Sequence, residues 1–243
     1  MNVKSAVRVI KVLEYFDSIR REAGVADIAR ALGYPASSTV GLLKSLMDLG
    51  YLVQDHQRMY RPTPRVTLLG GWIDPVLAPG GPVIAMMNEL SAETGETIVL
   101  GIRSGITARY IHVVPATQQM RLHTSVGQVR PLFQTCMGRA LLAGLDDSEV
   151  RQLLFRHNTS QPADGHQITY AGVRRDIQNI RTQGYSVSID RFYKGVGMVA
   201  ALLPEREQAD PMAVGVGGLS SSIKAQVATL GKLIANTIER HLT

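Results

Sequence analysis

Cysteine and tryptophan occur only once each in this chain of 243 residues, and aromatic residues make up only 5% of it. The single cysteine, Cys136, excludes an intrachain disulfide and favours a reducing compartment. The sequence has no run of about 18 apolar residues, which excludes a membrane-spanning helix. Its first residues form a polar amphipathic pattern and lack the apolar segment of a signal peptide. We therefore expect a cytoplasmic protein without a membrane partner.

Residues that carry chemistry are also sparse. His112, His123 and Cys136 have separations that match no metal-ligand spacing. Cys136, at the start of a predicted helix, is either a reactive thiol with a lowered pKa or a buried thiol that lines a pocket. The second interpretation is favoured, because no His–Asp pair can be placed beside it from the sequence. The glycines at 195, 197, 215 and 217 lack the helix context of a phosphate-binding loop. We expect no enzyme activity, no metal and no cofactor.

The formal net charge is +6, and it is unevenly distributed. Residues 1–65 hold 10 Lys and Arg against 6 Asp and Glu, whereas the remaining 178 residues hold 16 against 14. A basic excess concentrated in one segment suits a surface that binds phosphate. A generic basic surface would give the same modest excess. The arrangement of residues within this segment has to distinguish a phosphate-binding surface from a generic basic one.

Residues 25–52 predict two helices joined by a tight turn. Gly33 follows the first helix, and Pro35 takes the first position of the second helix. The second helix has an apolar stripe formed by Val40, Leu43 and Met47. Its other face is small, polar and cationic, with Ser37, Ser38, Gly41, Lys44 and Ser45. Such a helix fits the DNA major groove without repelling phosphate, while an ordinary helical hairpin in a core is the alternative.

The flanking segments favour DNA binding. An upstream amphipathic helix, able to cover the hairpin, is indicated by Ala6, Val9, Ile10, Leu13 and Phe16. Downstream, residues 51–54 and 59–62 predict two short strands around a turn at 55–58, which would form a wing. Arg58 at the tip, with Arg61 and Arg65 beyond it, suits phosphate or minor-groove contacts. These patterns predict a winged helix-turn-helix domain over residues 1–66.

The composition changes after this domain. Residues 68–82 contain two Gly pairs and three prolines, so a continuous helix is hard to sustain there. We interpret residues 67–82 as an inter-domain linker with a short helical piece around 72–77, which includes the lone Trp72.

Residues 83–243 predict a second domain with mixed elements. Helices are expected at 83–94, 135–143, 148–155, 170–183 and 220–241, the last with an N-cap among the serines at 220–222. Strands are expected at 97–102, 108–114, 120–125, 185–190, 195–203 and 212–217. Antiparallel strands with helices at both ends indicate the α+β class and argue against a doubly wound nucleotide fold.

The order and spacing of several segments resemble the IclR family of bacterial transcription regulators over nearly the whole chain. These segments are ADIARALGYPASSTVGLLKSL, LSAETGETIVLGI, VRPLFQTCMGRALLA and QGYSVSIDRFYKGVGMVAALL. The resemblance implies a winged helix joined by a linker to a GAF/PAS-like effector-binding domain over residues 83–243. It also implies a homodimer or homotetramer that binds near-palindromic, double-stranded operator DNA. Small organic acids are the usual effectors of the family, whose members repress or activate transcription.

The resemblance also implies two sets of site residues. The DNA-binding residues would be Ser37, Ser38, Thr39 and Lys44 of the recognition helix, with Arg58, Tyr60 and Arg61 of the wing. The effector-binding residues would be Phe133, Gln134, Thr135, Cys136, Met137, Gly138, Asp190, Met198, Ala200 and Gly217. Free N–H groups at the start of the 135–143 helix would seat a carboxylate.

Four positions depart from the usual pattern of the family. Gly41 replaces a larger side chain in the recognition helix, and Arg58 stands near the usual glycine of the wing. The run around Asp190 is less acidic than usual, and Gly217 replaces a small hydroxyl residue. From the change at Gly217 we expect a roomier, more apolar pocket, able to take an aromatic or branched acid.

Two classes of function follow from these observations. The first is a sequence-specific transcription regulator whose DNA binding is controlled by a small organic acid. The alternative is a small-molecule-binding protein or enzyme with an incidental winged helix. The basic N-terminal segment and the lack of a catalytic arrangement favour the regulator.

Overall fold

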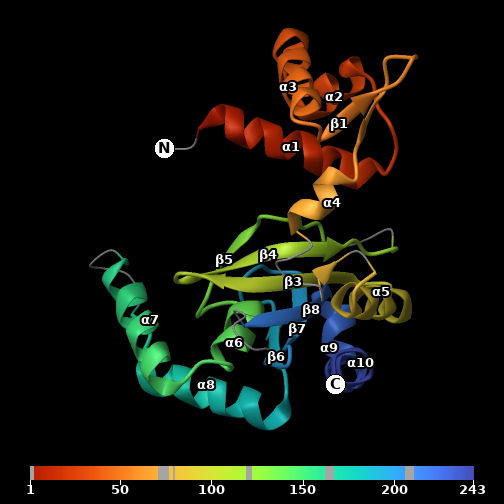
Figure 1. Cartoon of the computed structure of the whole chain (residues 1–243). Helices are drawn as coiled ribbons and strands as arrows, with labels where there is room; N and C mark the ends of the chain where they lie inside the picture. The colour runs from red at the N-terminus through yellow and green to blue at the C-terminus, as the bar shows by residue number, and fades with distance from the viewer. Residues whose placement is uncertain (1–2, 71–76, 79, 119–121, 162–166, 206–210) are drawn as a thin grey trace. The chain divides into compact units, whose positions relative to one another are not determined.

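A computed structural model of the chain describes residues 3–70, 77–78, 80–118, 122–161, 167–205 and 211–243 (Figure 1). It divides into two compact units, Met1–Ala78 and Pro79–Thr243. The division falls inside the segment interpreted as a linker, and each unit has its own core. Among the described helices, none is long and apolar enough to cross a membrane.

The first unit consists of helices and a two-stranded sheet. Its elements are α1 (Lys4–Ile19), α2 (Val25–Leu32), α3 (Ala36–Asp48), β1 (Leu52–Gln54), β2 (Tyr60–Pro62) and α4 (Arg65–Gly70). Gly33 ends α2 in the left-handed conformation, with a φ of 66°, as its place after the helix predicts. Pro35 is the N-cap of α3, so Ala36 and not Pro35 takes the first helical position.

The core of this unit corrects the predicted orientation of α3. Leu43 and Leu46 are buried, and Thr39 is fully buried between them and the start of the helix. The Thr39 hydroxyl can be buried because it donates to the backbone oxygen of Pro35 at 3.1 Å. Val40, expected in the apolar stripe, is 47% exposed. Met47 is partly buried against the same core, so the stripe is rotated by about one position and not replaced.

The predicted wing is confirmed as a hairpin. β1 and β2 pair antiparallel, with Val53 opposite Arg61. The Asp55 carboxylate closes the turn, since it accepts from the backbone N–H groups of Gln57 at 2.9 Å and Met59 at 2.8 Å. Tyr60 is buried and forms a backbone bridge with Ala23, which ties the wing to the segment between α1 and α2.

The expected linker contains more helix than its composition suggests. α4 extends to Gly70 and so covers the first four residues of the segment. The expected helical piece around 72–77, with Trp72, lies almost entirely outside the described residues.

The second unit is built on a six-stranded antiparallel sheet. Its strands are β3 (Thr97–Ser104), β4 (Thr107–Val114), β5 (Val129–Pro131), β6 (Ser186–Ile189), β7 (Val196–Leu202) and β8 (Met212–Leu219). Their spatial order is β5-β4-β3-β8-β7-β6. The expected strand at 120–125 is wrong over residues 122–125, which are irregular; the third strand is β5, formed after the turn at Gly127.

Helices pack on both faces of this sheet. They are α5 (Pro82–Thr94), α6 (Cys136–Leu142), α7 (Asp147–Thr159), α8 (Tyr170–Gln183), α9 (Ser220–Ala225) and α10 (Val227–Leu242). Of these, α7 and α8 form an outer layer beyond α6 (Figure 1). α6 packs on the face that presents Gly101 and Gly215, where its Met137 fills the space that larger residues would take. α9 lies on the opposite face, with Ile223 against Gly197. Gly215 of β8 and Gly197 of the neighbouring β7 therefore face different helical layers.

The C-terminal helix differs from its prediction in two ways. The single helix expected at 220–241 is broken at Gln226 into α9 and α10. Its N-cap is Leu219, and the serines do not cap it. Ser222 instead donates to the buried carboxylate of Glu96 at 2.9 Å. The N-cap of α7 is Asp146, whose side chain accepts from the backbone N–H groups of Ser148 and Glu149.

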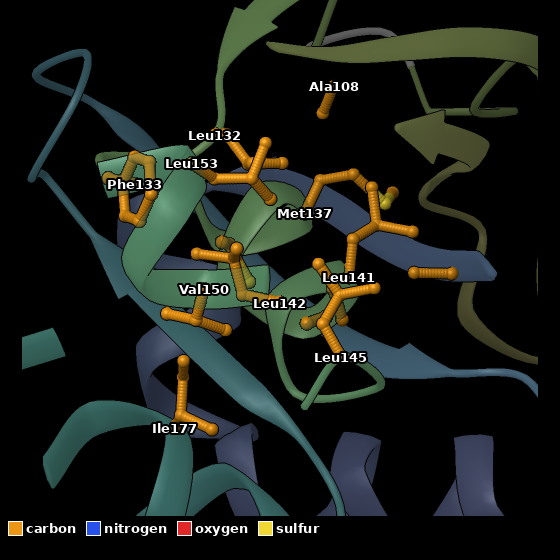
Figure 2. Close-up of a cluster of buried hydrophobic side chains, with 14 of the residues drawn as sticks. Ala108, Leu132, Phe133, Met137, Leu141, Leu142, Leu145, Val150, Leu153 and Ile177 are labelled. Atoms are coloured by element: carbon orange, nitrogen blue, oxygen red, sulfur yellow. The ribbon is translucent and has the colours of Figure 1, made fainter. Parts of the chain in front are cut away.

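Figure 2 shows the buried side chains around α6. Met137, Leu141 and Leu142 are fully buried at the centre of this cluster. Val150 and Leu153 come from α7, and Ile177 comes from α8. Gly138 fits because α6 passes so close to the backbone of Leu132 that any Cβ would clash with it. This core fixes the position of the loop that precedes α6.

Candidate nucleic-acid interface and effector cavity

One face of α3 remains exposed and free of carboxylates along most of its length. Ser37, Val40, Gly41 and Lys44 are exposed at helical spacing and form a single stripe, which we call the α3 stripe. Space around Gly41 is open. A slim stripe with one cation at its end has the shape and charge that major-groove entry requires.

Two of the predicted DNA-binding residues are placed elsewhere. The Thr39 side chain faces the core, and the Tyr60 ring is only 7% exposed. Both are needed for packing, so neither presents the surface that a base or phosphate contact requires. Val40 was missed by sequence reasoning, since an apolar residue on an amphipathic helix is normally assigned to the core. Its exposed methyl groups suit contact with a thymine methyl.

The wing presents the remaining predicted cations. Arg58 and Arg61 are exposed. Arg58 adopts a φ of 63°, the left-handed conformation for which glycine is favoured, in agreement with its place at the usual glycine of the wing. Just beyond the wing, the Arg65 guanidinium lies 5.0 Å from the centroid of the Tyr51 ring, which holds this further cation in place.

A small cavity lies in the second unit between α6 and one end of the sheet; we call it the effector cavity. Its volume is about 50 Å³. Its walls come from distant parts of the sequence: Tyr110, Leu122, Thr124, Arg130, Thr135, Cys136, Ser188, Phe192, Tyr193, Val196, Gly197 and Met198. Most of these residues are apolar or aromatic, and Arg130 is the only cation among them.

Arg130 is held at the wall by two aromatic rings. Its guanidinium carbon lies 5.7 Å from the centroid of Tyr110 and 5.5 Å from that of Tyr193. Burial raises the pKa of Tyr110, while the neighbouring Arg130 acts in the opposite direction. The phenol is therefore neutral near pH 7, and the charge at this end of the cavity is that of Arg130.

Cys136 lines the cavity as a protonated thiol. Its Sγ lies 3.2 Å from the backbone oxygen of Ser186 and 3.3 Å from that of Met198, so the thiol can donate to either. Burial raises the pKa of Cys136 to about 12. Its position at the helix start therefore does not produce a reactive thiol with a lowered pKa. Of the two interpretations of Cys136, the buried thiol that lines a pocket fits the structure.

The predicted effector-binding residues are only partly brought together. Thr135, Cys136 and Met198 line the effector cavity. Met137 and Ala200 are fully buried in the core, and Gly138 is required by backbone packing. Gln134 is exposed, and Phe133 packs against His157 with their ring centroids 5.2 Å apart. The Thr135 hydroxyl accepts from the Gly138 N–H at 3.3 Å, so one of the helix-start donors is already satisfied.

The structure also places Asp190 and Gly217 differently from their predicted roles in the cavity. Asp190 is exposed with a φ of 53°, and its carboxylate accepts from the Gly195 N–H at 2.6 Å, which closes the β6–β7 turn. Gly217 does not enlarge the cavity, because a Cβ there would meet Leu122 at 2.9 Å and Met198 at 3.0 Å. These flexible side chains occupy the space that the missing side chain leaves.

Sequence reasoning missed the polar residues Tyr110, Thr124, Arg130 and Ser188. Arg130 stands in the segment VRPLFQTCMGRALLA, three residues before Phe133, where the predicted pocket loop begins. A lone cation next to a predicted pocket loop was the available signal. The other three have none, because each is an ordinary strand or loop residue until the sheet register is known.

Comparison with known proteins agrees with this architecture. Residues 83–238 match the family model described as the bacterial transcriptional regulator IclR C-terminal domain, and residues 5–56 match the IclR helix-turn-helix domain. The Escherichia coli K12 regulator XynR is 25% identical over 224 residues, covering 91% of this chain and 88% of XynR. The Escherichia coli K12 repressor AllR is 24% identical over 246 residues, covering 95% of this chain and 86% of AllR.

Solved structures show the same fold. An IclR regulator from Alicyclobacillus acidocaldarius is 24% identical and superimposes with a TM-score of 0.62, covering 99% of this chain and 98% of that one. IclR of Thermotoga maritima is 19% identical with a TM-score of 0.61, covering 99% of both chains.

A winged helix-turn-helix unit followed by an antiparallel-sheet effector unit defines a two-domain, DNA-binding transcription regulator. Both units of this chain match models of one family, and the larger match covers well over half of its length. The chain belongs to the IclR family of bacterial transcription regulators. The members of this family are regulators and not enzymes, which removes the alternative of an enzyme with an incidental winged helix.

Proposed function

We propose that this protein is an oligomeric, cytoplasmic regulator whose operator binding is controlled by a small organic acid in the effector cavity. The observation that carries the proposal is the position of Arg130, the cation at the wall of an otherwise largely apolar cavity. A guanidinium can bind a carboxylate through two parallel hydrogen bonds, which fixes its orientation as well as its charge. The apolar wall would then select the body of the acid.

The cavity volume supports a short acid and not an aromatic one. A cavity of about 150 Å³ can hold benzene. The effector cavity measures about 50 Å³, and the space at Gly217 is filled by Leu122 and Met198. We therefore replace the expectation of an aromatic or branched acid with a proposal of a compact aliphatic acid.

DNA recognition in this proposal rests on the α3 stripe and the wing. Lys44 of the α3 stripe and Arg58 and Arg61 of the wing are exposed cations that would contact phosphates of double-stranded operator DNA. Effector binding can alter DNA affinity only by favouring one arrangement of the oligomer over another. Two recognition helices have to meet half-sites whose spacing is fixed by the DNA helical repeat, so a small change in their separation is sufficient.

The test combines a ligand panel with charge variants. Acetate, propionate, isobutyrate and benzoate are screened by thermal shift, followed by gel shifts on DNA upstream of the protein's own gene. We expect the short acids to stabilise the wild type and to change the DNA complex. Arg130→Gln should weaken acid binding by about 10- to 100-fold. Lys224→Gln, an exposed cation on α9, is the matched control and should have no effect.

Lys44→Glu combined with Arg61→Glu should abolish operator binding and leave acid binding unchanged, because the two sites lie in different units. Wild-type affinity for DNA should fall steeply with salt. Acid binding that survives Arg130→Gln would disprove the role given to Arg130. Stabilisation by benzoate alone would disprove the size argument.

A further inference from the structure

A second cavity lies on the outer side of α6, and it shares no lining residue with the effector cavity. Its volume is about 340 Å³, within the range of small-molecule sites. The walls come from α6, from the start of α8 with the segment before it, and from the loop after β6. We call it the α8 cavity.

The α8 cavity is lined by an excess of positive charge. Its lining includes three cations, Arg139, Arg175 and Arg191, but only one carboxylate, that of Asp176. Asp176 is bound to Arg139 at 3.2 Å, which neutralises that pair. Arg175 and Arg191 are exposed, and within the described part of the chain neither has a carboxylate partner. Among the described residues, the guanidinium groups of Arg175 and Arg191 are therefore the ones that carry unneutralised positive charge at this cavity.

Arg139 is the unusual member of this set. Arg139 is only 7% exposed, although its guanidinium carries a permanent charge. Besides Asp176, it donates from Nη2 to the backbone oxygen of Val187 at 3.0 Å. Its Nε is buried and has no hydrogen-bond partner among the described residues. An unsatisfied donor on a buried cation is costly. This Nε lies behind the cavity wall, so Arg139 is fixed by Asp176 and Val187 and offers no free donor to the cavity through this atom.

The start of α8 adds a second positive feature. Thr169 caps this 14-residue helix through its hydroxyl, which accepts from the Gly172 N–H at 3.4 Å. Thr169 and Gly172 both line the cavity, so the positive end of the helix dipole adjoins it. The opposite wall is apolar, with Phe133, Leu142, Ile168 and Val173.

From this arrangement we infer that the α8 cavity is a second ligand site, which takes a small metabolite with two negative charges and a short apolar body. Arg175, Arg191 and the helix start match a phosphate monoester or a dicarboxylate, since both chemistries present paired anionic oxygens. A monocarboxylate would leave one guanidinium unpaired, which separates this site from the effector cavity.

The site has a physical connection to the effector cavity. Arg139 follows Cys136 by about one turn on α6, and Arg191 directly precedes Phe192 in the loop after β6. Arg139 and Arg191 line the α8 cavity, whereas Cys136 and Phe192 line the effector cavity. A dianion bound at the arginines would therefore act on two walls of the effector cavity, which gives the regulator a second chemical input.

The test is calorimetric titration of the full-length protein, without DNA, with phenyl phosphate and separately with succinate. These two probes distinguish the phosphate and dicarboxylate forms of the ligand. Arg175→Gln combined with Arg191→Gln is the variant of choice, because both side chains are exposed and the fold does not depend on them. Lys224→Gln combined with Lys232→Gln removes the same charge from exposed positions on α9 and α10. Arg130→Gln is the control for the effector cavity.

We expect saturable binding of at least one probe to the wild type. Binding should fall by about tenfold or more in the double arginine variant, because charged hydrogen bonds are lost. It should be unchanged in the lysine variant and in Arg130→Gln. Absence of saturable binding of both probes would overturn the inference, as would equal losses in the arginine and lysine variants. A loss in Arg130→Gln alone would place the probe in the effector cavity and would also overturn it, while leaving the proposed effector function intact.

Discussion

Cys136 shows how the same residue changes meaning with its surroundings. A cysteine at the start of a helix is a familiar place for a reactive thiolate. Here the thiol is 2% exposed and lies within hydrogen-bond distance of two backbone oxygens. Since only the thiolate attacks electrophiles and metals, a pKa raised to about 12 makes this residue inert.

We predict that native Cys136 resists alkylation by iodoacetamide at about pH 8, where roughly one thiol in ten thousand would be ionised. The chain unfolded in guanidinium should react fully, because its thiol regains an ordinary pKa. Intact-mass spectrometry over time measures both rates. Equal rates for native and unfolded protein would show that the thiol is accessible and reactive.

The exposed stripe of α3 depends on the orientation of the whole helix. Leu43 and Leu46 face the core, and this leaves Val40 beside Gly41 and Lys44 on the surface. The alternative orientation, with Val40 inside, would have turned Thr39 outward. The hydrogen bond from Thr39 to Pro35 satisfies the buried hydroxyl, so the observed orientation carries no unpaired polar group at this position.

This orientation is tested by two alanine variants of α3. Leu43→Ala should cost about 2–5 kcal/mol in the free energy of unfolding of the first unit, because it leaves a cavity in the core. Val40→Ala should change that free energy by less than about 0.5 kcal/mol. Chemical denaturation followed by far-ultraviolet circular dichroism measures both values. A large loss in Val40→Ala would return Val40 to the core.

At the scale of the whole molecule, the two units carry separate cores and separate sites. Residues of the first core and residues of the α6 cluster come from different sides of the boundary at Ala78. A ligand stabilises only the unit whose folded state it binds. The two activities of the regulator are therefore expected to leave separate signatures in unfolding.

We predict two transitions in differential scanning calorimetry of the full-length protein. DNA should raise the midpoint temperature of one transition, and a bound acid should raise that of the other. Each ligand, at a concentration of 100 times its Kd, should add about 2.7 kcal/mol to the free energy of unfolding of the unit that binds it. The Lys44→Glu and Arg61→Glu variant should lose only the shift caused by DNA. A single transition moved equally by both additives would contradict the independence of the units.

The sequence by itself determined the elements whose causes are local. Gly33 and Gly184 were placed after helices by their position in the chain, and both adopt the left-handed conformation there. The span 170–183 was predicted to the residue, since its periodicity and terminal signals agree. The wing, the recognition helix and the α+β class followed from the same kind of evidence, because helix period, strand alternation and caps act within a few residues.

Only the tertiary structure decided which side chains meet. The effector cavity collects residues from Tyr110 to Met198, and their convergence depends on strand order and register, which no local pattern encodes. Asp190 was assigned to the cavity from its place in the chain, but a φ of 53° turns its carboxylate into the adjoining turn. The space expected at Gly217 was taken by Leu122 and Met198, because cores pack to high density and neighbouring side chains fill what a missing one leaves.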